Sequence, residues 1–381
     1  MSEYYSSRLD GKRKSDKRKR NSLWGILLNA VMAVVSVVTA FCMFMIFIGG
    51  FVPPEKLWYF SLLGLVSPII YVLAMVSLLY WIVRWKWRMA AFMMFFVFIG
   101  LFRVSLYYKI DITREYEEPQ YDRDHIKVLS YNIRQMRNDK WQLTADSIRK
   151  FIADCKPDII CFQESHSDIE SADMVDSLLR GYNATRTDKV DGQFVRCYSK
   201  FRIIRCDSLD GMCGTGSGIW ADMRIGSDTV RVFNVHLQTT SITADDKEYI
   251  INHRFISDST RENKMHSIAR RLYDNSLMRA RQVEALHAHI AESPYPVILC
   301  GDFNDVPMSY AYRTASRGLT DTFSEQGHGY AHTFRGFFNM LRIDYILVSD
   351  EFETLSYEVP RIAASDHYPV FVRLKLDERQ Q

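Results

Sequence analysis

The chain has 381 residues, of which 48% are hydrophobic and 24% charged, and this length allows two structural units. Residues 1–118 contain 15 Lys and Arg against 8 Asp and Glu, whereas residues 119–381 contain 33 against 37, a net charge of −4. Proteins that grip duplex DNA generally present a basic surface to the phosphates. The acidic balance of the second part therefore argues against a DNA-repair nuclease, although a local basic face is compatible with it.

Three apolar blocks dominate residues 21–110 and predict three transmembrane helices. Residues 21–54 and 57–83 carry no charged side chain, and each run exceeds the roughly 20 residues that a helix needs to cross a bilayer. Tryptophans lie near the block ends, where interfacial anchors are common. The third block, residues 89–108, contains Arg103, whose long side chain can reach the membrane surface. The alternative is a set of long buried helices in a soluble protein.

The charges around these blocks predict the direction of each crossing. The tail of residues 1–20 and the loop of residues 84–88 are rich in Lys and Arg, whereas the loop between the first two blocks offers only Lys56, balanced by Glu55. Positively charged loops stay in the cytoplasm. Three crossings therefore give a multi-pass membrane protein with a cytoplasmic basic tail and an extracytoplasmic C-terminal domain. A basic tail is also typical of nucleic-acid binding, but next to an apolar span it more often sets topology and attracts anionic lipid.

Residues 111–123 are polar and predict a short linker that keeps the following domain close to the bilayer. Strand-like runs then alternate with helical patterns at about 141–155, 262–292 and 308–317. Few of them follow a strict strand-helix-strand order, so we predict an α/β domain over residues 124–376 with a pair of mixed sheets and flanking helices. The strand candidates are residues 126–131, 158–162, 194–199, 217–223, 229–236, 296–300, 343–348 and 368–374.

A long polar stretch from Thr239 to Asn275 follows one of these strands. Long connections of this kind are usually functional loops or disordered segments. We interpret the stretch as a loop on the substrate side of the domain, with a surface insertion as an equal alternative.

Six short polar motifs carry the chemistry, and each follows a strand-like apolar run. Side chains at strand ends can converge from distant segments, and carboxylate and amide oxygens with two imidazoles suit a hydrated divalent cation and the hydrolysis of a phosphate ester. The motifs are Leu-Ser-Tyr-Asn132-Ile-Arg, Ile-Ile-Cys-Phe-Gln-Glu164, Phe-Asn234-Val-His236-Leu, Ile-Leu-Cys-Gly-Asp302-Phe-Asn304-Asp, Arg-Ile-Asp344-Tyr-Ile-Leu and Ser-Asp366-His367-Tyr-Pro-Val.

In this order the motifs resemble those of the endonuclease/exonuclease/phosphatase superfamily, which includes DNases, sphingomyelinases and inositol-phosphate phosphatases. The resemblance covers roughly residues 124–376. It implies a four-layer α/β sandwich with two packed mixed β-sheets. The segment around Asp344 lacks the Pro-x-Trp-Cys-Asp-Arg signature of the inositol-polyphosphate 5-phosphatases.

For the metal, the residues and the resemblance together indicate Glu164 as the leading ligand and Asp366 as a second one. Asn132 is grouped with them, because it can hold a metal-bound water or a phosphate oxygen beside Glu164. Mg²⁺ suits such a sparse set of oxygens because it retains several waters, and Mn²⁺ is the expected substitute.

For catalysis, the resemblance implies that Asp344 orients and charges His367, and that Asp302 orients or deprotonates the attacking water. It further implies that Asn304 donates to the phosphate, and that His236 contacts the phosphate or protonates the leaving oxygen. Whether Asp302 or the pair of His367 and Asp344 is the base stays open.

Four further residues could reach a phosphate, but the sequence supports ordinary surface positions equally well. Three of them precede the helical run of residues 283–290, and the fourth lies before the Asp344 strand: Arg279, Arg281, Gln282 and Thr333.

The sequence thus predicts a membrane-anchored, Mg²⁺-dependent phosphoesterase that acts outside the cytoplasm, with a lipid headgroup or another phosphodiester as its preferred substrate. The first alternative is an extracytoplasmic nuclease. An alternative of another class is a non-catalytic membrane-bound binding module.

Overall fold

The computed structural model describes residues 23–56, 59–109, 125–165, 169–185, 195–240, 258–336 and 339–377. The predicted basic tail and the predicted linker of residues 111–123 lie outside these ranges. The described residues divide into two compact units, one within residues 1–47 and 66–102 and the other within residues 48–65 and 103–381.

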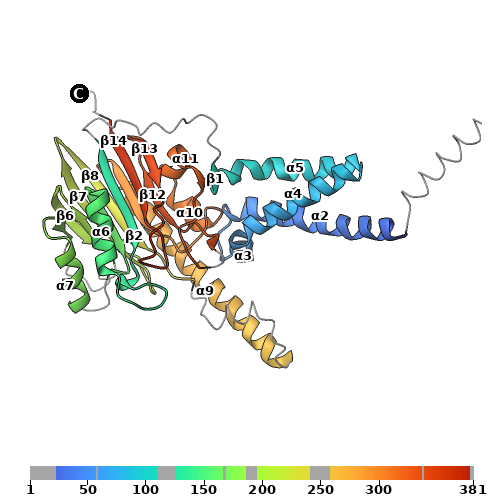
Figure 1. Cartoon of the computed structure of the whole chain (residues 1–381), viewed down its shortest axis with the longest axis horizontal. Helices are drawn as coiled ribbons and strands as arrows, with labels where there is room; N and C mark the ends of the chain where they lie inside the picture. The colour runs from blue at the N-terminus through green and yellow to red at the C-terminus, as the bar shows by residue number, and fades with distance from the viewer. Residues whose placement is uncertain are drawn as a thin grey trace, which may run out of the picture. The chain divides into compact units, whose positions relative to one another are not determined.

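The first unit consists of apolar helices: α2 (Leu23–Gly49), α4 (Ser67–Val83) and α5 (Trp87–Val104) (Figure 1). Polar side chains join α2 to α4, since the indole of Trp81 donates to Ser36 Oγ at 2.8 Å and the hydroxyl of Tyr80 donates to Asn29 at 2.7 Å. Hydrogen bonds of this kind hold apolar helices together where no water competes.

The second apolar block does not form one continuous helix, contrary to the prediction. It is divided into α3 (Tyr59–Leu65) and α4, and Val66 between them leaves the helical conformation. Pro68 lies in the first turn of α4, where its missing N–H group is tolerated; further inside a helix it would remove a hydrogen bond. Among the described residues, two helices, α2 and α5, are therefore long and apolar enough to cross a membrane, and α4 is a shorter apolar helix of 17 residues.

The second unit contains two six-stranded mixed sheets, as predicted. In the first, called the β2 sheet, β2 and β3 are parallel and the other neighbours antiparallel. In the second, called the β8 sheet, β8 and β9 are the parallel pair. The β2 sheet runs β13 (Phe352–Glu358), β14 (Val370–Leu376), β2 (Ile126–Asn132), β3 (Ile159–Gln163), β5 (Val195–Ser199), β4 (Asn183–Ala184). The β8 sheet runs β10 (Thr320–Asp321), β12 (Asp344–Val348), β9 (Val297–Asp302), β8 (Asp228–His236), β7 (Ser217–Ile225), β6 (Arg202–Ser208).

The two sheets pack face to face, with helices on their outer faces. Alternate residues of each strand face opposite sides: Val128 belongs to the core between the sheets, whereas Leu129 packs with Ile148 of α6 (Ala145–Cys155). Helix α7 (Ile169–Leu178) joins α6 on this face. On the outer face of the β8 sheet, Phe233 and Leu299 pack against α9 (Asp258–Ala291) and α10 (Tyr310–Ala315). The packing thus gives four layers, with the two sheets in the middle and helices on either side.

All eight predicted strands are present, with ends shifted by at most two residues, but the four edge strands (β4, β6, β10 and β13) and the helix α7 were not predicted. The long connection expected from Thr239 to Asn275 is shorter, because α9 already begins at Asp258. Residues 241–257 of that connection lie outside the described ranges, so its predicted role as a substrate loop stays a prediction.

The segments that flank the apolar helices belong to the second unit and pack within it. Phe51, just after α2, lies under the guanidinium of Arg313 in α10. After α5, the carbonyl of Leu106 accepts a hydrogen bond from Arg342 at 3.0 Å, and β1 (Tyr108–Lys109) pairs with β11 (Gly329–Tyr330). The chain therefore enters the second unit at the ends of both α2 and α5.

Candidate active site

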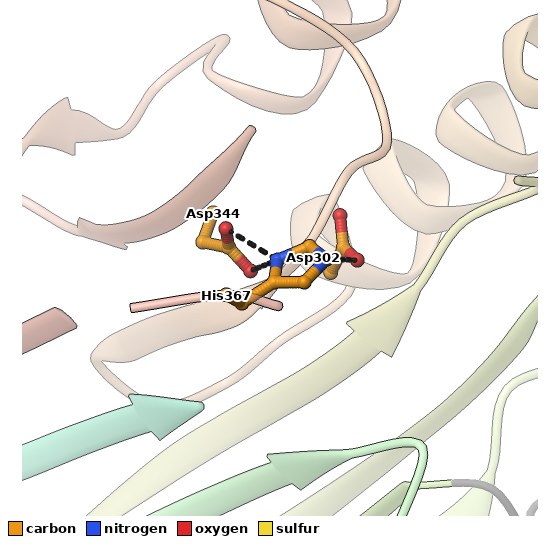
Figure 2. A group of neighbouring side chains, drawn as sticks. All are labelled: Asp302, Asp344 and His367. Carbon is orange, nitrogen blue, oxygen red and sulfur yellow. Dashed lines mark hydrogen bonds and ion pairs between the residues drawn. The ribbon is translucent and has the colours of Figure 1, made fainter. Parts of the chain in front are cut away.

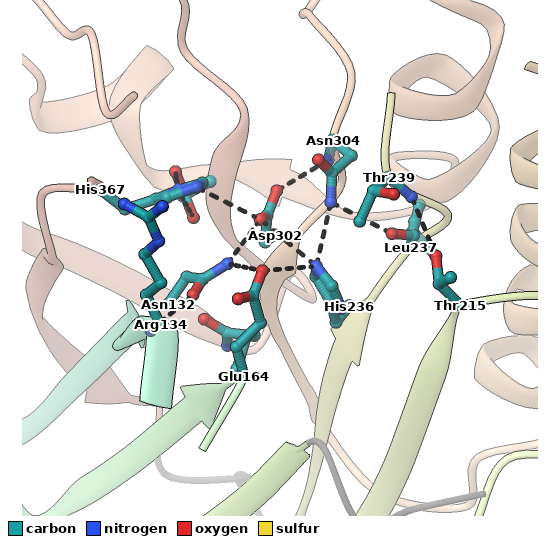
Figure 3. A network of polar contacts seen from close by, with 12 residues as sticks. Asn132, Arg134, Glu164, Thr215, His236, Leu237, Thr239, Asp302, Asn304 and His367 are labelled. Carbon is teal, nitrogen blue, oxygen red and sulfur yellow. Dashed lines mark hydrogen bonds and ion pairs between the residues drawn. The ribbon is translucent and has the colours of Figure 1, made fainter. Parts of the chain in front are cut away.

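Strand register brings three of the predicted residues side by side at one end of the β8 sheet. His236 ends β8 opposite Asp302, the last residue of β9, and Asp344 begins β12 opposite the same Asp302. In the β2 sheet, Asn132 ends β2 opposite Gln163, the last residue of β3, and Glu164 follows directly. The polar residues therefore lie at the carboxyl ends of both parallel strand pairs (Figure 3).

His367 lies between two buried carboxylates. Its Nδ1 is 2.9 Å from Asp344 Oδ2 and its Nε2 is 3.7 Å from Asp302 Oδ2 (Figure 2). Burial by itself lowers the pKa of His367, but the charges of Asp344 and Asp302 outweigh it and raise this pKa well above its usual value. Burial and the neighbouring Asp344 also raise the pKa of Asp302, against the opposing influence of the two histidines. The two carboxylates therefore favour the charged form of the imidazole.

Asn132 connects the two sheets across the centre of the site. Its side-chain amide donates to Glu164 Oε1 at 3.0 Å and to Asp302 Oδ2 at 2.9 Å, while its oxygen accepts from the backbone N–H of Arg134. Ser365 Oγ donates to the Asn132 carbonyl at 2.8 Å. The amide nitrogen, and not the oxygen, thus faces the two carboxylates.

His236 and Asn304 complete the opposite side of the site. The Asn304 amide is 3.1 Å from His236 Nε2, and the same Nε2 is 3.5 Å from Glu164 Oε1. Asp302 Oδ1 accepts from the backbone N–H of Asn304 at 2.8 Å. This contact holds Asn304 beside the carboxylate that it follows in sequence.

Several residues at these strand ends adopt strained backbone conformations. Glu164 has φ of 45° and Asn304 of 50°, and Arg134 begins a run of three residues with positive φ. Each such non-glycine residue costs on the order of 1–3 kcal/mol, a strain that is typical of functional sites. The turns after β2, β3 and β9 are therefore held in place by their surroundings.

Asp366 lies at the more exposed edge. Its side chain is 26% exposed and its Oδ2 is 3.3 Å from Arg134 Nη1. Asp366 is the neighbour of His367 in sequence, and Ser365 Oγ contacts it at 3.3 Å. Through these contacts all eight predicted site residues belong to one connected group.

Buried polar residues contact the backbone or the neighbours of this group. The sequence either did not predict them or could not decide between a phosphate contact and a structural role. Thr333 Oγ1 accepts from the backbone N–H of Asp344 at 3.1 Å, and Arg279 pairs with Asp305, directly after Asn304. Gln282 accepts from the backbone of Gln238, two residues after His236. These three contact protein, so they are positioning residues, whereas Arg281 is exposed. Gln163, which donates to Asn234 Oδ1 at 2.7 Å between the sheets, was not singled out.

The residues present suit a divalent cation. Glu164 and Asp366, whose side chains are 30% and 26% exposed, offer carboxylate oxygens that solvent reaches, and carboxylates of this kind fit a hard, hydrated ion. The ligand atoms of Asp302, Asp344 and His367 also lie within 4.8 Å of one another. In that group, however, His367 Nδ1 is already hydrogen-bonded to Asp344, and a metal between them would break this contact.

Residues 129–367, more than half of the chain, match the model of the Endonuclease/Exonuclease/phosphatase family. The chain therefore belongs to this family, whose members are hydrolases of phosphoester bonds that depend on a divalent metal. The protein is accordingly a metal-dependent hydrolase of phosphoester bonds, and the alternative of a non-catalytic module is wrong. Residues 29–107 match a domain of unknown function, DUF8431. No curated protein sequence matches the chain.

A solved structure of the same family name supports the fold, and others are similar to part of the chain. The crystal structure of an endonuclease/exonuclease/phosphatase from Bacteroides vulgatus matches with a TM-score of 0.50 and 19% identity, over 66% of this chain and 99% of that one. A humanized D. rerio TDP2 matches with a TM-score of 0.49 and 14% identity, over 66% of this chain and 99% of that one. A mannosyl-6-phosphatase of Bacteroides thetaiotaomicron matches with a TM-score of 0.47 and 20% identity, over 65% of this chain and 99% of that one. At 19% identity the likeness to the Bacteroides vulgatus structure concerns the fold alone.

Proposed function

We propose that this protein is a membrane-anchored, Mg²⁺-dependent phosphoesterase that hydrolyses phosphodiesters, preferably those of lipid headgroups, outside the cytoplasm. The observation that carries the chemical part is the connected group of eight residues at the strand ends of both sheets. Its core is His367, which lies 2.9 Å from Asp344 and 3.7 Å from Asp302. Charged groups so close together at a rim are suited to hold and polarise a phosphoester.

Glu164 and Asp366 would hold the ion through their carboxylate oxygens. Mg²⁺ fits a site with one or two carboxylates because it retains several waters, and Mn²⁺ would substitute for it. A bound ion would neutralise charge on the phosphoryl oxygens during the reaction. Asn132, whose amide nitrogen faces Glu164 and Asp302, would orient these two carboxylates and a water molecule of the site.

The remaining residues divide the proton transfers. We assign Asp302 as the group that orients the attacking water and accepts its proton, because its carboxylate lies at the centre of the group and is hydrogen-bonded to Asn132. His367, charged through Asp344, would donate to a phosphoryl oxygen. Asn304 would donate to another phosphoryl oxygen, and His236, 3.1 Å from the Asn304 amide, would protonate the leaving oxygen.

The membrane part of the proposal has independent support. α2 and α5 have the length and composition of membrane spans, and the 17 residues of α4 are at the lower limit of the roughly 17–25 that suffice. The segment between α2 and α4 and the segment after α5 both belong to the second unit. Three crossings are consistent with this, because they leave those two segments on one side of the bilayer, with the positively charged residues 1–20 and 84–88 on the other.

The experiment is a hydrolysis screen of the full-length protein in detergent or in vesicles, with Mg²⁺, across lipid phosphodiesters, nucleic acids and phosphate monoesters. We expect activity to be lost in EDTA, to return with Mg²⁺ or Mn²⁺, and to be highest on lipid headgroups. A preference for DNA or RNA would instead support the extracytoplasmic nuclease. Activity that survives chelation would contradict the metal-dependent mechanism.

A further inference from the structure

Two arginines and one tryptophan lie at the Asp366 edge of the site and take no part in the mechanism above. They are Arg134, two residues after Asn132, Arg335, and Trp141 in the turn before α6. We infer that these three residues, called the arginine rim, bind a second acidic group of the substrate, a carboxylate or a phosphate other than the one that is cleaved. The inference rests on the proposed function and narrows its substrates to phosphoesters with an additional negative charge.

The two guanidinium groups of the rim share one exposed carboxylate. Arg335 Nη1 is 2.9 Å from Asp139 Oδ2, and Arg134 Nη1 is 3.7 Å from Asp139 Oδ1. The side chain of Asp139 is 49% exposed, whereas those of Arg134 and Arg335 are 24% and 25% exposed. Asp139 is therefore an acidic group that lies on the solvent side of two partly buried cations.

A substrate group can take the place of Asp139. Ion pairs of exposed carboxylates contribute little to stability, so releasing Asp139 costs little. A carboxylate or phosphate that enters from solvent finds the same two guanidinium groups, whose planar N–H donors suit both kinds of anion. Asp139 thus occupies the position that the rim offers to an incoming anion.

Both arginines are held in place before any substrate arrives. Arg335 Nη1 donates to the carbonyl of Ser365 at 2.8 Å, and its backbone N–H donates to the carbonyl of Asp366. The guanidinium carbon of Arg134 lies 4.9 Å from the ring centre of Trp141, a cation–π contact. Figure 3 shows the Arg134 side chain extending from the end of β2 toward His367. Cations fixed in this way lose little entropy when they bind a ligand.

The face of Trp141 that solvent reaches completes the rim. The side chain of Trp141 is exposed, with 60% of the residue's surface open to solvent. Its backbone is held in a turn, because its N–H donates to the carbonyl of Asn138 at 2.9 Å. An exposed ring that already contacts a guanidinium presents a flat apolar surface directly beside the charged groups. It can pack against the part of the substrate that joins the two acidic groups.

Electrostatics gives the rim a role in selecting substrates. The proposed site contains the carboxyl groups of Glu164, Asp302, Asp344 and Asp366, and the charged His367 offsets only part of their charge. An additional negative charge on the substrate is therefore repelled unless further cations meet it. Arg134 contacts one of these carboxylates, Asp366, at 3.3 Å, and so lies next to the reacting group. The rim would therefore favour substrates with a second acidic group over otherwise identical ones without it.

The test compares substrates that differ only by one acidic group, with full-length protein. For nucleotides the pair is thymidine 5′-(p-nitrophenyl phosphate) with and without a 3′-phosphate. For lipids the pair is phosphatidylserine and phosphatidylethanolamine, each in phosphatidylcholine vesicles, which differ by one carboxylate. We expect kcat/KM to favour the acidic member in at least one pair, which identifies the source of the group. Arg134→Gln and Arg335→Gln should each reduce that preference about tenfold, mainly through KM, and Arg134→Lys should restore part of it.

Two further variants control the experiment. Asp139→Asn removes the competing carboxylate and should increase the preference, whereas Arg149→Gln, which removes an exposed charge on α6, should leave it unchanged. Equal losses on both members of a pair would mean that the arginines contact the scissile phosphate or only support the fold, and would overturn the inference. So would a wild-type protein that shows no preference for either acidic member.

A binding measurement separates this inference from the proposed function. Calorimetry in EDTA compares thymidine 3′,5′-bisphosphate with thymidine 5′-phosphate, for the wild type and for Arg335→Gln. If the protein binds the bisphosphate more tightly and the variant loses this difference, the rim is an anion site even where no diester is hydrolysed. Equal affinity of the wild type for both nucleotides, together with no preference in the lipid pair, would refute it.

Discussion

The Nδ1 atom of His367 lies 2.9 Å from Asp344 Oδ2, in a contact that is almost completely shielded from water. Asp344 is fixed from the other side, because its backbone N–H donates to Thr333 Oγ1. Asp344 therefore orients the imidazole and, together with Asp302, favours its charged form. If the two residues act as one unit, removing either should remove nearly the whole effect.

We accordingly expect Asp344→Asn and His367→Ala each to lower kcat by about 100- to 10,000-fold, the usual range for proton transfer by a positioned side chain. The double variant should lose little more than either single one, because groups that act together are not additive. The measurement is a double-mutant cycle on a chromogenic diester, with thermal unfolding of each variant to verify the fold. Asp350→Asn, at an exposed aspartate, is the matched control. Losses that multiply would show that the two residues act independently.

Glu164 and His236 should separate in a metal titration, although their side chains are only 3.5 Å apart. Glu164→Gln removes a charged oxygen ligand, so the Mg²⁺ concentration for half-activation should rise by about tenfold or more, a loss of about 1.4 kcal/mol or more in binding. His236→Ala should leave that concentration nearly unchanged and lower kcat by about 100-fold. Activity is measured against Mg²⁺ concentration at saturating substrate. Identical titration curves for the two variants would contradict the separate roles proposed for them.

Reporter fusions test the direction of the membrane crossings. A reporter fused after Gln381 should behave as extracytoplasmic and one fused after Arg88 as cytoplasmic, because the basic residues 84–88 should remain inside. The measurement is the activity of a compartment-specific reporter at each position. A cytoplasmic signal after Gln381 would mean that the chain crosses an even number of times. Because Arg103 lies in the last turn of α5, that helix would be the first suspected of not spanning.

The buried ion pair between Arg342 and Asp321 should contribute strongly to the free energy of unfolding of the second unit. Arg342 Nη2 lies 2.6 Å from Asp321 Oδ1, both side chains are buried, and Tyr312 donates to Asp321 Oδ2 at 2.6 Å. Asp321→Asn leaves the guanidinium without its counter-charge, which should lower the free energy of unfolding by about 3–5 kcal/mol.

The stability change is measured as the thermal unfolding midpoint of the full-length protein in detergent. The matched control is Asp146→Asn, in an exposed pair with Arg149 on α6, where the change should stay below about 0.5 kcal/mol because surface ion pairs are weak. Similar midpoints for the two variants would show that the buried pair is not important for stability.

Short, nearly continuous apolar runs were sufficient to predict the strands that bear the site, because a strand buried on both faces needs apolar residues along most of its length. Strand β2 is an example, with Val128 toward one core and Leu129 toward the other. Edge strand β6 escaped prediction, since Arg202, Arg205 and Asp207 leave it without a buried pattern. The break of the second apolar block followed from Pro68, which was visible in the sequence but outweighed by the absence of charges.

The sequence by itself predicted which eight residues carry the proposed chemistry, because each stands at one end of an apolar run and carries a group that few structural roles require at such a position. Only the tertiary structure decided how they meet. The register of β9 with β8 and β12 places His236 and Asp344 on either side of Asp302. The pairing of Arg134 and Arg335 around Asp139 depends on a turn and a loop about 200 residues apart. Contacts between distant segments arise from the packing of whole sheets, which no local pattern of side chains encodes.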